Sequence, residues 1–525
     1  MGTNSYDVVV IGAGIAGLGT AAMLAKDFGK RVLVVERAPF IGGRAVSFVG
    51  NGNKVTVDGL ELDADGLRKA LGHARTFISN TYPDLDTIFE QGLLDGYTFE
   101  AGGHGLFWGN KGRIEFLLQH LGEFVDIPVN TGFAFVDWEG GNKKYQVEPL
   151  RPYPWMSEEA YEGTRNALRD MAIATFEDMA RLMDVSLEEW LRDKNLNDEA
   201  YDFVKVLISS QSAMAEPAMA PVGDVLGYMA IARPIKMNII TGSVGTVPEP
   251  GTIAIPQAME KVLLAHAGEV RRSTTVKEVL IEAGKSRGVV ISTPDGGQET
   301  VRADAVICTI PPKYIFSVLP RQPFPADWVD VLENRFWGAG LLSAYIGLKR
   351  NVWEQYGIDE RSFVYMPGAI RNEGFIGDVD IVMWGMGAVA DRAPEGKRTF
   401  EFSVALTDNE QRDPQRVKRV TDWCDNYFRE TFPTWEEDME FCIWTPSPEA
   451  YGLWRPVGEG VERPDVKSPW VEGLYFAGDQ YGRRLWGGGI DGAAISAVMC
   501  VDSMMGANYE EEIFPWYHRG IPDRP

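Results

Sequence analysis

The sequence is poor in the residues that build disulfides, metal sites and membrane spans. Only four cysteines and five histidines occur among 525 residues. No C-x-x-C pair or Cys/His cluster is present, so neither a structural zinc site nor a redox dithiol is indicated, and no metal is expected. The simplest interpretation is four buried thiols in a reducing cytosol. No apolar run approaches the ~18 residues that a membrane span needs.

Basic residues are scarce relative to acidic ones. The chain has 51 Lys and Arg against 75 Asp and Glu, a net charge of -24 at pH 7. Such a surface repels phosphate backbones, so nucleic acid is not expected as a partner. The negative charge also disfavours binding of the whole molecule to anionic lipid, although a local surface could still contact a membrane. The first residues, MGTNSY, lack a basic stretch followed by an apolar one, which predicts a cytoplasmic location. No pattern indicates an oligomeric state.

A strand–turn–helix–strand pattern opens the chain. Residues 6–11 (YDVVVI) form a β-branched run typical of a buried strand, and residues 12–17 (GAGIAG) follow as a G-x-G-x-x-G motif. Apolar residues continue at helical spacing over 18–25, and a second apolar run at 31–35 ends at Glu36. The alternative for a lone glycine motif is an ordinary turn. Here every part of a dinucleotide-binding unit stands in order, which favours the binding interpretation.

Each position of the glycine motif has a mechanical reason. Gly12 permits a tight turn, Gly14 lets the backbone approach a pyrophosphate, and Gly17 lets the helix pack closely on the strand. Free N–H groups at the helix N-terminus, which begins with Ile15 and Ala16, face the phosphates. The motif therefore predicts a binding site for a dinucleotide.

The acidic residue after the second strand, Glu36, lies nineteen residues after the last glycine, where it can accept hydrogen bonds from an adenosine ribose. An acid here favours a 2′-hydroxyl over a 2′-phosphate and disfavours NADP. Residues 36–45 then read ERAPFIGGRA. This turn resembles that of the flavoprotein superfamily of amine oxidases, protoporphyrinogen oxidase and phytoene-desaturase-like enzymes. The resemblance implies that Arg37 and Gly43 lie beside an FAD molecule and that Arg44 reaches its phosphates.

A second block of the pattern lies near the other end of the chain. Residues 473–497 read GLYFAGDQYGRRLWGGGIDGAAISA, which is similar to the C-terminal FAD signature of that superfamily. Gly478 and Asp479 end a short predicted strand, and the carboxylate can accept hydrogen bonds from ribityl hydroxyls. Gly489 and Ile490 begin a small-residue helix whose free N–H groups can stabilise negative charge on a reduced flavin. Both chain ends are therefore predicted to fold onto one FAD molecule.

The resemblance extends to the layout of the whole chain and predicts the fold. It implies an α/β architecture, with a discontinuous Rossmann-like FAD-binding domain and a mixed α+β substrate-binding domain. By the same resemblance, Val276 lies on a strand whose backbone contacts adenine. The expected boundaries are 1–110, 245–330 and 465–510 for the FAD-binding domain, 111–244 and 331–464 for the substrate-binding domain, and 511–525 for a tail.

Residues 45–98 depart from the family pattern. They separate the Gly-Gly-Arg turn from the next cofactor segment at 99–105 (FEAGGHG). Two stretches within them, 67–78 and 85–94, are predicted to be helical. The insertion is interpreted as a lid or an interface, or equally as a surface insertion that the fold tolerates.

The candidate catalytic residues are His104, Trp454 and Trp486. His104 is the one histidine in a glycine-rich segment expected to reach the flavin ring, as a base or a hydrogen-bond donor, although a histidine that bonds backbone is the commoner case. Amine oxidases often place two aromatic residues across the flavin face, and Trp454 and Trp486 are the candidates here. Ordinary packing of these large rings is the alternative. Amine oxidases also usually carry a lysine in the strand after the Pro-Pro segment, whereas residues 338–345 (GAGLLSAY) contain none.

The predicted function is that of an FAD-dependent oxidoreductase, a dehydrogenase or desaturase rather than an oxidase. It transfers a hydride between flavin N5 and a C–C or C–N bond of an apolar or unsaturated small molecule, as in phytoene-desaturase-like enzymes. A non-catalytic flavin-binding protein is ranked last, and two enzymatic alternatives stay open. One is a flavin enzyme without net redox change, such as an isomerase or hydratase of an activated alkene, and the other is an amine oxidase. No Cys or His lies inside the recognised flavin signature, so FAD is expected to be non-covalent.

Overall fold

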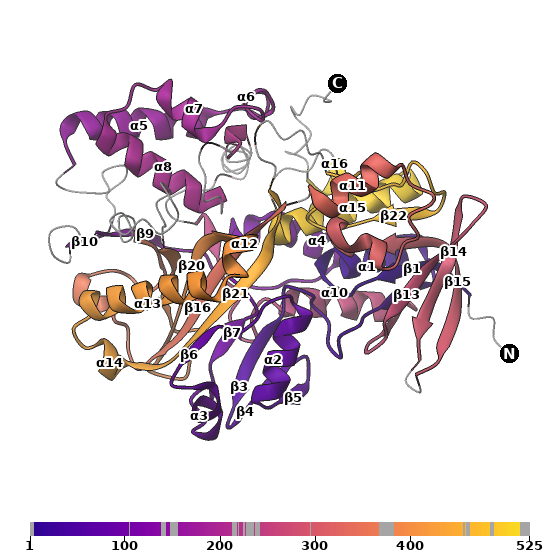
Figure 1. Ribbon diagram of the computed structural model, residues 1–525, viewed down its shortest axis with the longest axis horizontal. Helices are drawn as coiled ribbons and strands as arrows, with labels where there is room; N and C mark the ends of the chain where they lie inside the picture. The colour runs from indigo at the N-terminus through magenta and orange to yellow at the C-terminus, as the bar shows by residue number, and fades with distance from the viewer. Residues whose placement is uncertain are drawn as a thin grey trace.

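Most of the chain is described by a computed structural model (Figure 1). Helices from the two ends of the sequence, α1 (Ile15–Phe28) in indigo and α15 (Gly489–Met505) in yellow, pack against each other. The two ends therefore build one helical layer. The described residues are 5–103, 105–137, 143–146, 156–212, 218, 220–223, 226, 236, 242–293, 296–335, 337–366, 383–454, 457, 463–482 and 488–514.

The first sheet grows from the strand–turn–helix–strand unit. β1 (Ser5–Ile11) is parallel to β2 (Val32–Val35) on one side and to β15 (Gln298–Cys308) on the other. β12 (Glu269–Arg271) extends the sheet beyond β2, and β22 (Leu474–Phe476) runs parallel to β15. The apolar side chains of β1 and β2 alternate between two separate core clusters, one on each face. Burial on both faces explains why these strands read as continuous apolar runs.

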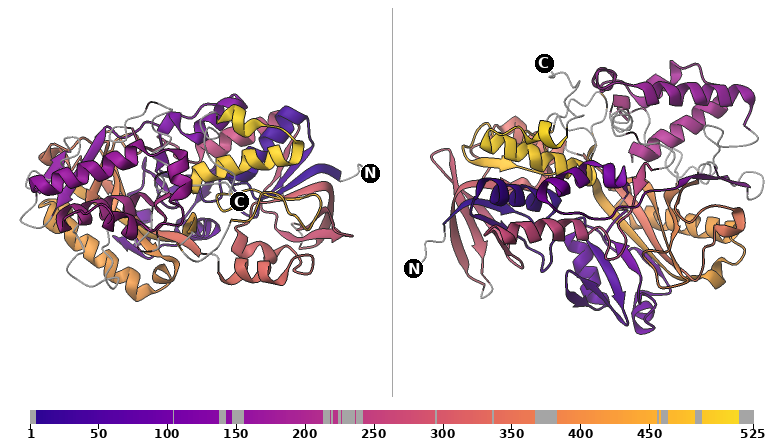
Figure 2. Two further views of the ribbon diagram at one scale, coloured as in Figure 1. Left: turned by 90° about the horizontal axis from the view of Figure 1, so that it is seen from above. Right: turned by 180° about the vertical axis from the view of Figure 1, so that it is seen from behind.

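An antiparallel extension and two layers of helices complete this part of the fold. β13 (Val276–Glu282) and β14 (Lys285–Ser292) continue the sheet, whose strand order is β12-β2-β1-β15-β14-β13. The helices of one face come from segments far apart in the sequence, as Figure 2 shows. They are α1, α4 (Arg113–Leu121), α10 (Ala254–Ala265), α15 and α16 (Tyr509–Ile513). On the other face lie η2 (Pro312–Ser317) and α11 (Ala326–Asn334).

The insertion at 45–98 forms a small layer of its own with both strands and helices. The predicted helices are present but end earlier than the predicted 67–78 and 85–94, as α2 (Ala64–His73) and α3 (Leu85–Glu90). The helix α2 stops because Arg75 adopts a left-handed conformation with φ of 62°. The sequence reasoning missed the strands, which form a sheet in the order β5-β4-β3-β7. These strands are β3 (Ser47–Asn51), β4 (Lys54–Val57), β5 (Leu60–Leu62) and β7 (Thr98–Glu100).

A second large sheet is built mainly from the later half of the chain. Its strand order is β10-β9-β17-β19-β20-β16-β21-β6. The edge strand β6 (Asn80–Tyr82) comes from the insertion and pairs antiparallel with β21. The insertion therefore belongs to this sheet as well as to its own layer. The remaining strands are β9 (Gly132–Asp137), β10 (Lys143–Gln146), β16 (Trp337–Leu348), β17 (Ser362–Met366), β19 (Met383–Val389), β20 (Arg398–Thr407) and β21 (Met439–Trp454).

The helix α13 (Pro414–Thr431) packs against this second sheet. Its Phe428 ring meets the rings of Phe400 and Phe402 on β20 edge-on, with centroids 5.7 and 4.8 Å apart. These aromatic contacts give the sheet a core separate from that of the first sheet. Shorter helices nearby are η3 (Glu354–Tyr356), α12 (Asp408–Gln411) and α14 (Trp435–Asp438).

A helical lobe and a two-stranded ribbon complete the fold. The lobe stands beside the second sheet in Figures 1 and 2 and comprises α5 (Glu158–Ile173), α6 (Phe176–Arg181), α7 (Leu187–Arg192) and α8 (Asp198–Ser212). Ser186 caps α7 by accepting a hydrogen bond from the Glu189 amide at 3.1 Å. The ribbon joins β8 (Leu106–Phe107) to β11 (Val244–Gly245), and η1 (Gly109–Lys111) follows it. Within the described residues, no helix combines the length and apolar character that crossing a membrane requires.

Candidate functional site

A cavity of about 530 Å³ lies at the carboxyl ends of the parallel strands β1, β2, β15 and β22. Ligands of open α/β sheets characteristically bind at this edge. Every residue predicted to hold the cofactor lines this cavity, although the positions span almost the whole sequence. These residues are Gly12, Gly14, Ile15, Ala16, Gly17, Glu36, Arg37, Gly43, Arg44, Val276, Gly478, Asp479, Gly489 and Ile490.

The first glycine turn is enforced by close contacts inside the protein. Gly12 has a φ of 106°, and a Cβ there would lie 2.4 Å from Thr309 Oγ1. A Cβ on Gly17 would lie 2.1 Å from the backbone oxygen of Gly12. Real Cβ atoms do not approach this closely, so both glycines are required for β1, α1 and the end of β15 to meet. These two positions are therefore fixed by the shape of the turn, and both also line the cavity.

Gly14 differs from its neighbours because the protein leaves room beside it. A Cβ there would lie 3.9 Å from the Gly42 oxygen, an ordinary contact. The Gly42 amide donates to the Ala13 oxygen at 2.9 Å, and this bond lays the second glycine turn against the first. Gly43 follows with φ of 62°, and its own Cβ would lie 3.3 Å from Gly14 Cα. Since no protein atom demands glycine at position 14, its open side is the cradle that a bound pyrophosphate would fill.

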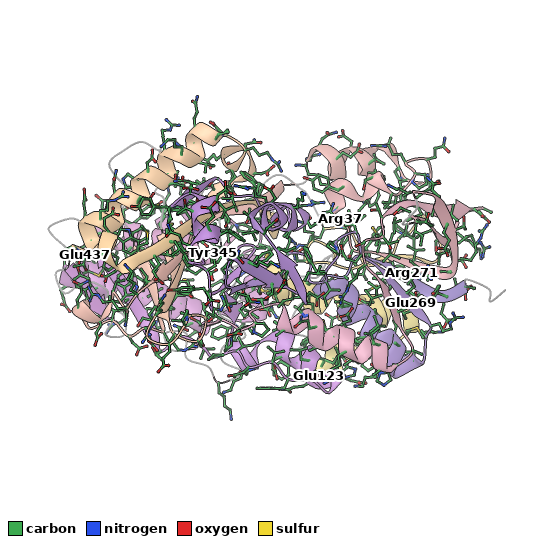
Figure 3. The ribbon with its side chains drawn as sticks, turned by 90° about the horizontal axis from the view of Figure 1, so that it is seen from below. Arg37, Glu123, Glu269, Arg271, Tyr345 and Glu437 are labelled. Carbon is green, nitrogen blue, oxygen red and sulfur yellow. The ribbon has the colours of Figure 1, made fainter. Side chains whose placement is uncertain are left out.

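The Glu36 carboxylate lines the cavity and also ties the turn together. Its Oε2 accepts the Ala13 amide and its Oε1 accepts the Ala38 amide, both at 2.8 Å. The prediction gave Glu36 a ribose as its partner, and the structure adds these two amides. Each carboxylate oxygen has further lone pairs, so the two roles are compatible. Arg37 turns to the insertion, where its Nη2 donates to the His73 carbonyl at 2.9 Å; Figure 3 labels it near the middle of the molecule.

Arg44 and Asp479 meet across the cavity although the resemblance gave them separate tasks. Arg44 Nη2 lies 2.7 Å from Asp479 Oδ1, so the two chain ends are joined by an ion pair. The other carboxylate oxygen, Oδ2, is buried, and none of the described residues donates a hydrogen bond to it. An unsatisfied buried acceptor costs about 1–3 kcal/mol. A ligand hydroxyl beside Asp479 would remove this cost, which fits the predicted ribityl contact.

The N-terminus of α15 also opens on the cavity. Gly488 precedes the helix in an extended conformation, and within the described residues no side chain caps this end. The first turn therefore offers N–H groups and a partial positive charge to a ligand. Asp491 in this turn was missed by the sequence reasoning, although it stands inside the recognised signature. Burial raises the pKa of Asp491 to about 6, while the nearby Arg113 guanidinium and the amides at the start of α4 act in the opposite direction.

One end of the cavity is formed by residues of β13 and η2. Val276 is the first residue of β13 and pairs with Ile291 of β14. The Val279 amide donates to the Val318 carbonyl at 2.8 Å, which places the residues after η2 against the same strand. Ser317 and Val318 line the cavity with Val276. This arrangement leaves a slot between a strand and a short helix, where the resemblance puts the adenine ring.

The glycine segment that follows β7 lies against the second sheet. The Gly103 amide donates to Ser343 Oγ on β16 at 3.1 Å, and this hydroxyl pairs with Ser403 Oγ of β20 at 2.9 Å. Gly102 and Gly103 line the cavity. The segment expected to reach the flavin ring is thus held by hydroxyl groups of the second sheet. No local sequence signal identified these serines, because their partners lie far away in the chain.

The structure does not describe the side chains of the candidate catalytic residues. His104 and Trp486 lie outside the described residues. Trp454 ends β21 opposite Trp337, but its side chain is not among the described ones. Their proposed roles stay predictions. Of the described residues, no group of His, Cys, Asp and Glu is arranged to hold a metal ion, and the four cysteines are buried.

Comparison with known families gives two matches. Residues 85–505 match the family described as flavin containing amine oxidoreductase. Residues 10–61 match the NAD(P)-binding Rossmann-like domain. The Rossmann-like match spans the first glycine motif and the Gly-Gly-Arg turn. The amine oxidoreductase match spans most of the other residues that line the cavity, and residues 73–76 lie outside both matches.

The curated relatives include phytoene desaturases. A zeta-carotene-forming phytoene desaturase of Myxococcus xanthus is 25% identical over 373 residues, 66% of this chain and 61% of that protein. A neurosporene-forming phytoene desaturase of Cereibacter sphaeroides is 30% identical over 132 residues, 25% of this chain and 24% of that protein. The chain therefore spans at most about three fifths of the length of these relatives.

Solved structures share the fold over nearly the whole chain. An oxidoreductase from Methanosarcina mazei superposes with a TM-score of 0.64 at 17% identity, covering 95% of this chain and 100% of that one. A putrescine oxidase bound to putrescine gives 0.60 at 15% identity, covering 96% and 99%. Cyclohexylamine oxidase from Brevibacterium oxydans gives 0.58 at 15% identity, covering 95% and 99%. At such identities the likeness establishes the architecture, a Rossmann-like α/β fold joined to a second sheet domain.

Proposed function

Because this chain belongs to the family of flavin-containing amine oxidoreductases, we propose that it is an FAD-dependent oxidoreductase acting on an apolar or unsaturated small molecule. The reaction we favour moves a hydride between flavin N5 and a C–C bond of the substrate, as in a dehydrogenase or desaturase. Oxidation of a C–N bond, the reaction of an amine oxidase, is the competing proposal. FAD is held without a covalent bond.

The described residues fit FAD as the cofactor. The open side of Gly14 leaves space for a pyrophosphate, and the buried Oδ2 of Asp479 lacks a hydrogen-bond donor that a ribityl hydroxyl would supply. Glu36 and Val276 would hold the adenosine, and Arg44 would lie beside the phosphates while it pairs with Asp479. When bound, the flavin supplies a two-electron centre at N5 that accepts or returns a hydride.

The chain's own part in the reaction is to position the flavin and to stabilise charge. The N–H groups at the start of α15 point at the cavity and would stabilise negative charge at the N1–C2 edge of the ring. The Ser343 hydroxyl holds the Gly103 amide, and through it the segment that would lie against the ring. A fixed ring allows a substrate carbon to be held at a distance suited to hydride transfer.

The observation that favours a desaturase or dehydrogenase concerns β16. Amine oxidases of this superfamily usually carry a lysine on the corresponding strand, where it holds a water near N5. Here β16 (WGAGLLSAYIGL) contains no lysine, and the residue that meets Gly103 is Ser343. A serine hydroxyl bonded to Ser403 carries no positive charge to the flavin. The phytoene desaturases among the relatives support the same choice, while the oxidases among the structural neighbours support only the fold.

The test is reduction of the bound flavin under anaerobic conditions. The purified protein is mixed with members of two panels, one of polyenes and isoprenoid hydrocarbons and one of primary and secondary amines, and the visible flavin absorbance is followed. Free FAD mixed with the same compounds is the control. Bleaching by a member of the first panel supports the proposal.

Other outcomes of this test count against it. Bleaching by amines alone favours an amine oxidase. Turnover of an alkene by the pre-reduced enzyme, without any electron acceptor, favours an isomerase or hydratase. A protein that stays colourless after addition of FAD contradicts the cofactor assignment itself.

A further inference from the structure

The segment between α2 and β6 crosses from the cofactor cavity to the second sheet. We call residues 73–79, which comprise the last residue of α2 and the segment that follows it, the strap. His73, Ala74, Arg75 and Thr76 of the strap line the cavity, although they belong to the insertion rather than to any recognised cofactor motif. The strap is thus a wall of the cavity that the family motifs do not account for.

At its first end the strap is fastened to residues around the adenosine side of the cavity. The Arg37 guanidinium donates to the His73 carbonyl at 2.9 Å, and Arg37 directly follows the acidic residue expected at the ribose. The Arg75 guanidinium lies over the ring of Tyr314, 3.8 Å from its centroid. Tyr314 belongs to η2, which leads into the residues that pair with β13. These contacts place Arg75 near the residues that the resemblance assigns to the adenosine and the phosphates.

At its second end the strap is fastened to β21. The hydroxyl groups of Thr76 and Ser447 lie 2.9 Å apart, and both residues are buried. The Phe77 amide donates to the Pro446 carbonyl at 3.2 Å, and the Ser79 amide donates to the Trp444 carbonyl at 3.0 Å. These bonds continue directly into the pairing of β6 with β21. The strap therefore has a defined path and is not a loosely attached surface loop.

The backbone conformation of Arg75 is uncommon for a residue other than glycine. Its φ of 62° lies in the left-handed region, and a left-handed residue just after a helix is usually glycine or asparagine. A long cationic side chain at such a position is disfavoured unless its contacts compensate for the strain. The side chain reaches a cavity that a dinucleotide fits, in a chain of net charge -24. A pyrophosphate is the group whose charge would best match a guanidinium there.

We propose that the strap is part of the dinucleotide site and that Arg75 retains FAD by contacting its adenosine-diphosphate half. This inference rests on the proposed function, because it takes FAD as the ligand of the cavity. It assigns a binding role to an insertion that the sequence left open as a lid, an interface or a tolerated surface segment.

The experiment measures how fast the full-length holoprotein releases FAD on dilution, using recovery of flavin fluorescence. Arg75→Asn removes the cation and keeps a residue that tolerates the left-handed conformation. Arg68→Asn is the matched control, because Arg68 lies on α2 of the same insertion and pairs at the surface with Asp65 at 2.9 Å. We expect release to be about tenfold faster in the Arg75 variant, the size of one lost charge-assisted contact, and unchanged in the control.

A second measurement locates the contact. ADP carries the adenosine and both phosphates but no flavin ring, so its Kd for the flavin-stripped protein should rise in the same proportion in Arg75→Asn. An unchanged rate of FAD release overturns the inference, as does faster release with unchanged ADP binding. If Arg75→Asn fails to fold, Arg75→Gln replaces it, because it also removes the positive charge, and release as slow as that of the wild type then overturns the inference. Failure of the wild-type protein to bind FAD refutes the proposed function instead, so the two failures are distinguishable.

Discussion

Two alanine substitutions in the first glycine motif separate folding from cofactor binding. Gly14 and Gly17 are three residues apart at the start of α1, yet the structure gives them different surroundings. A Cβ on Gly17 would lie 2.1 Å from the Gly12 oxygen, well below the 3.0 Å that real Cβ atoms respect. The Gly12 oxygen belongs to the backbone and cannot rotate away as a side chain could, so α1 must move away from the turn that follows β1. Overpacking of this kind costs about 1–3 kcal/mol or more, and Gly17→Ala should lower the free energy of unfolding by at least that much.

The Gly14→Ala substitution should behave in the opposite way. Gly14 has φ of -81° and ψ of 179°, which alanine adopts without strain, and its Cβ would meet the Gly42 oxygen at 3.9 Å. Alanine is a poorer N-cap than glycine, so a loss of under about 1 kcal/mol of stability is expected. The added methyl group would occupy the place where the pyrophosphate passes. The affinity for FAD should therefore fall about 100-fold, or about 2.7 kcal/mol.

Urea unfolding of the flavin-stripped proteins and titration with FAD measure the two effects separately. The expected result is a stable Gly14→Ala protein that binds FAD poorly, and a Gly17→Ala protein that unfolds at lower urea concentration. Wild-type affinity in the Gly14 variant would show that no phosphate approaches this backbone. An unchanged unfolding midpoint in the Gly17 variant would refute the contact between α1 and β1.

Two further substitutions test buried charges. Burial raises the pKa of Asp491 to about 6, so the native state binds its proton more tightly than the unfolded state, and this contribution to stability is lost as pH rises from about 4 to about 6. Relative to the wild type, the free energy of unfolding of Asp491→Asn should therefore rise by about 2–3 kcal/mol as the pH increases across that range, as measured by urea unfolding. A difference between the two proteins that does not depend on pH would contradict the assignment. Arg392 is 2% exposed and lies 2.7 Å from the fully buried Glu100, so Arg392→Met should cost about 3–5 kcal/mol in the same assay by leaving that carboxylate unpaired. The control, Arg398→Met, removes a more exposed pair with Glu360 and should cost under about 1 kcal/mol; equal losses would refute the argument.

The parts of the site that sequence could predict are those governed by local rules. The glycine turn at 12–17 requires its residues for steric reasons that operate within a single strand–turn–helix unit. Glu36 directly follows the second strand, and Gly489 begins a helix. Both positions follow from the spacing of apolar residues and from the glycines that bound the elements. Together with the family resemblance, these signals identified residues that all line one cavity.

The parts that sequence missed depend on pairing between distant segments. Arg44 and Asp479 are separated by 435 positions, and nothing near either residue indicates that they form an ion pair. The strands β3, β4 and β5 of the insertion are short and partly polar, and they exist because their neighbours complete a sheet. Asp491 was missed because its altered pKa arises from burial against α4, which only packing creates.

By itself, the amino-acid sequence determined the dinucleotide motif and the two glycine-rich segments, because each rests on the conformations available to a few consecutive residues. The expectation of a flavin came from the resemblance of these segments to a known family. Tertiary structure alone decided that the insertion forms a wall of the cavity, that Ser343 meets the Gly103 amide, and that Arg75 lies over Tyr314. Such contacts depend on how whole sheets pack, and the free energy of that packing is shared among residues far apart in the chain. A short stretch of sequence therefore does not predict these contacts.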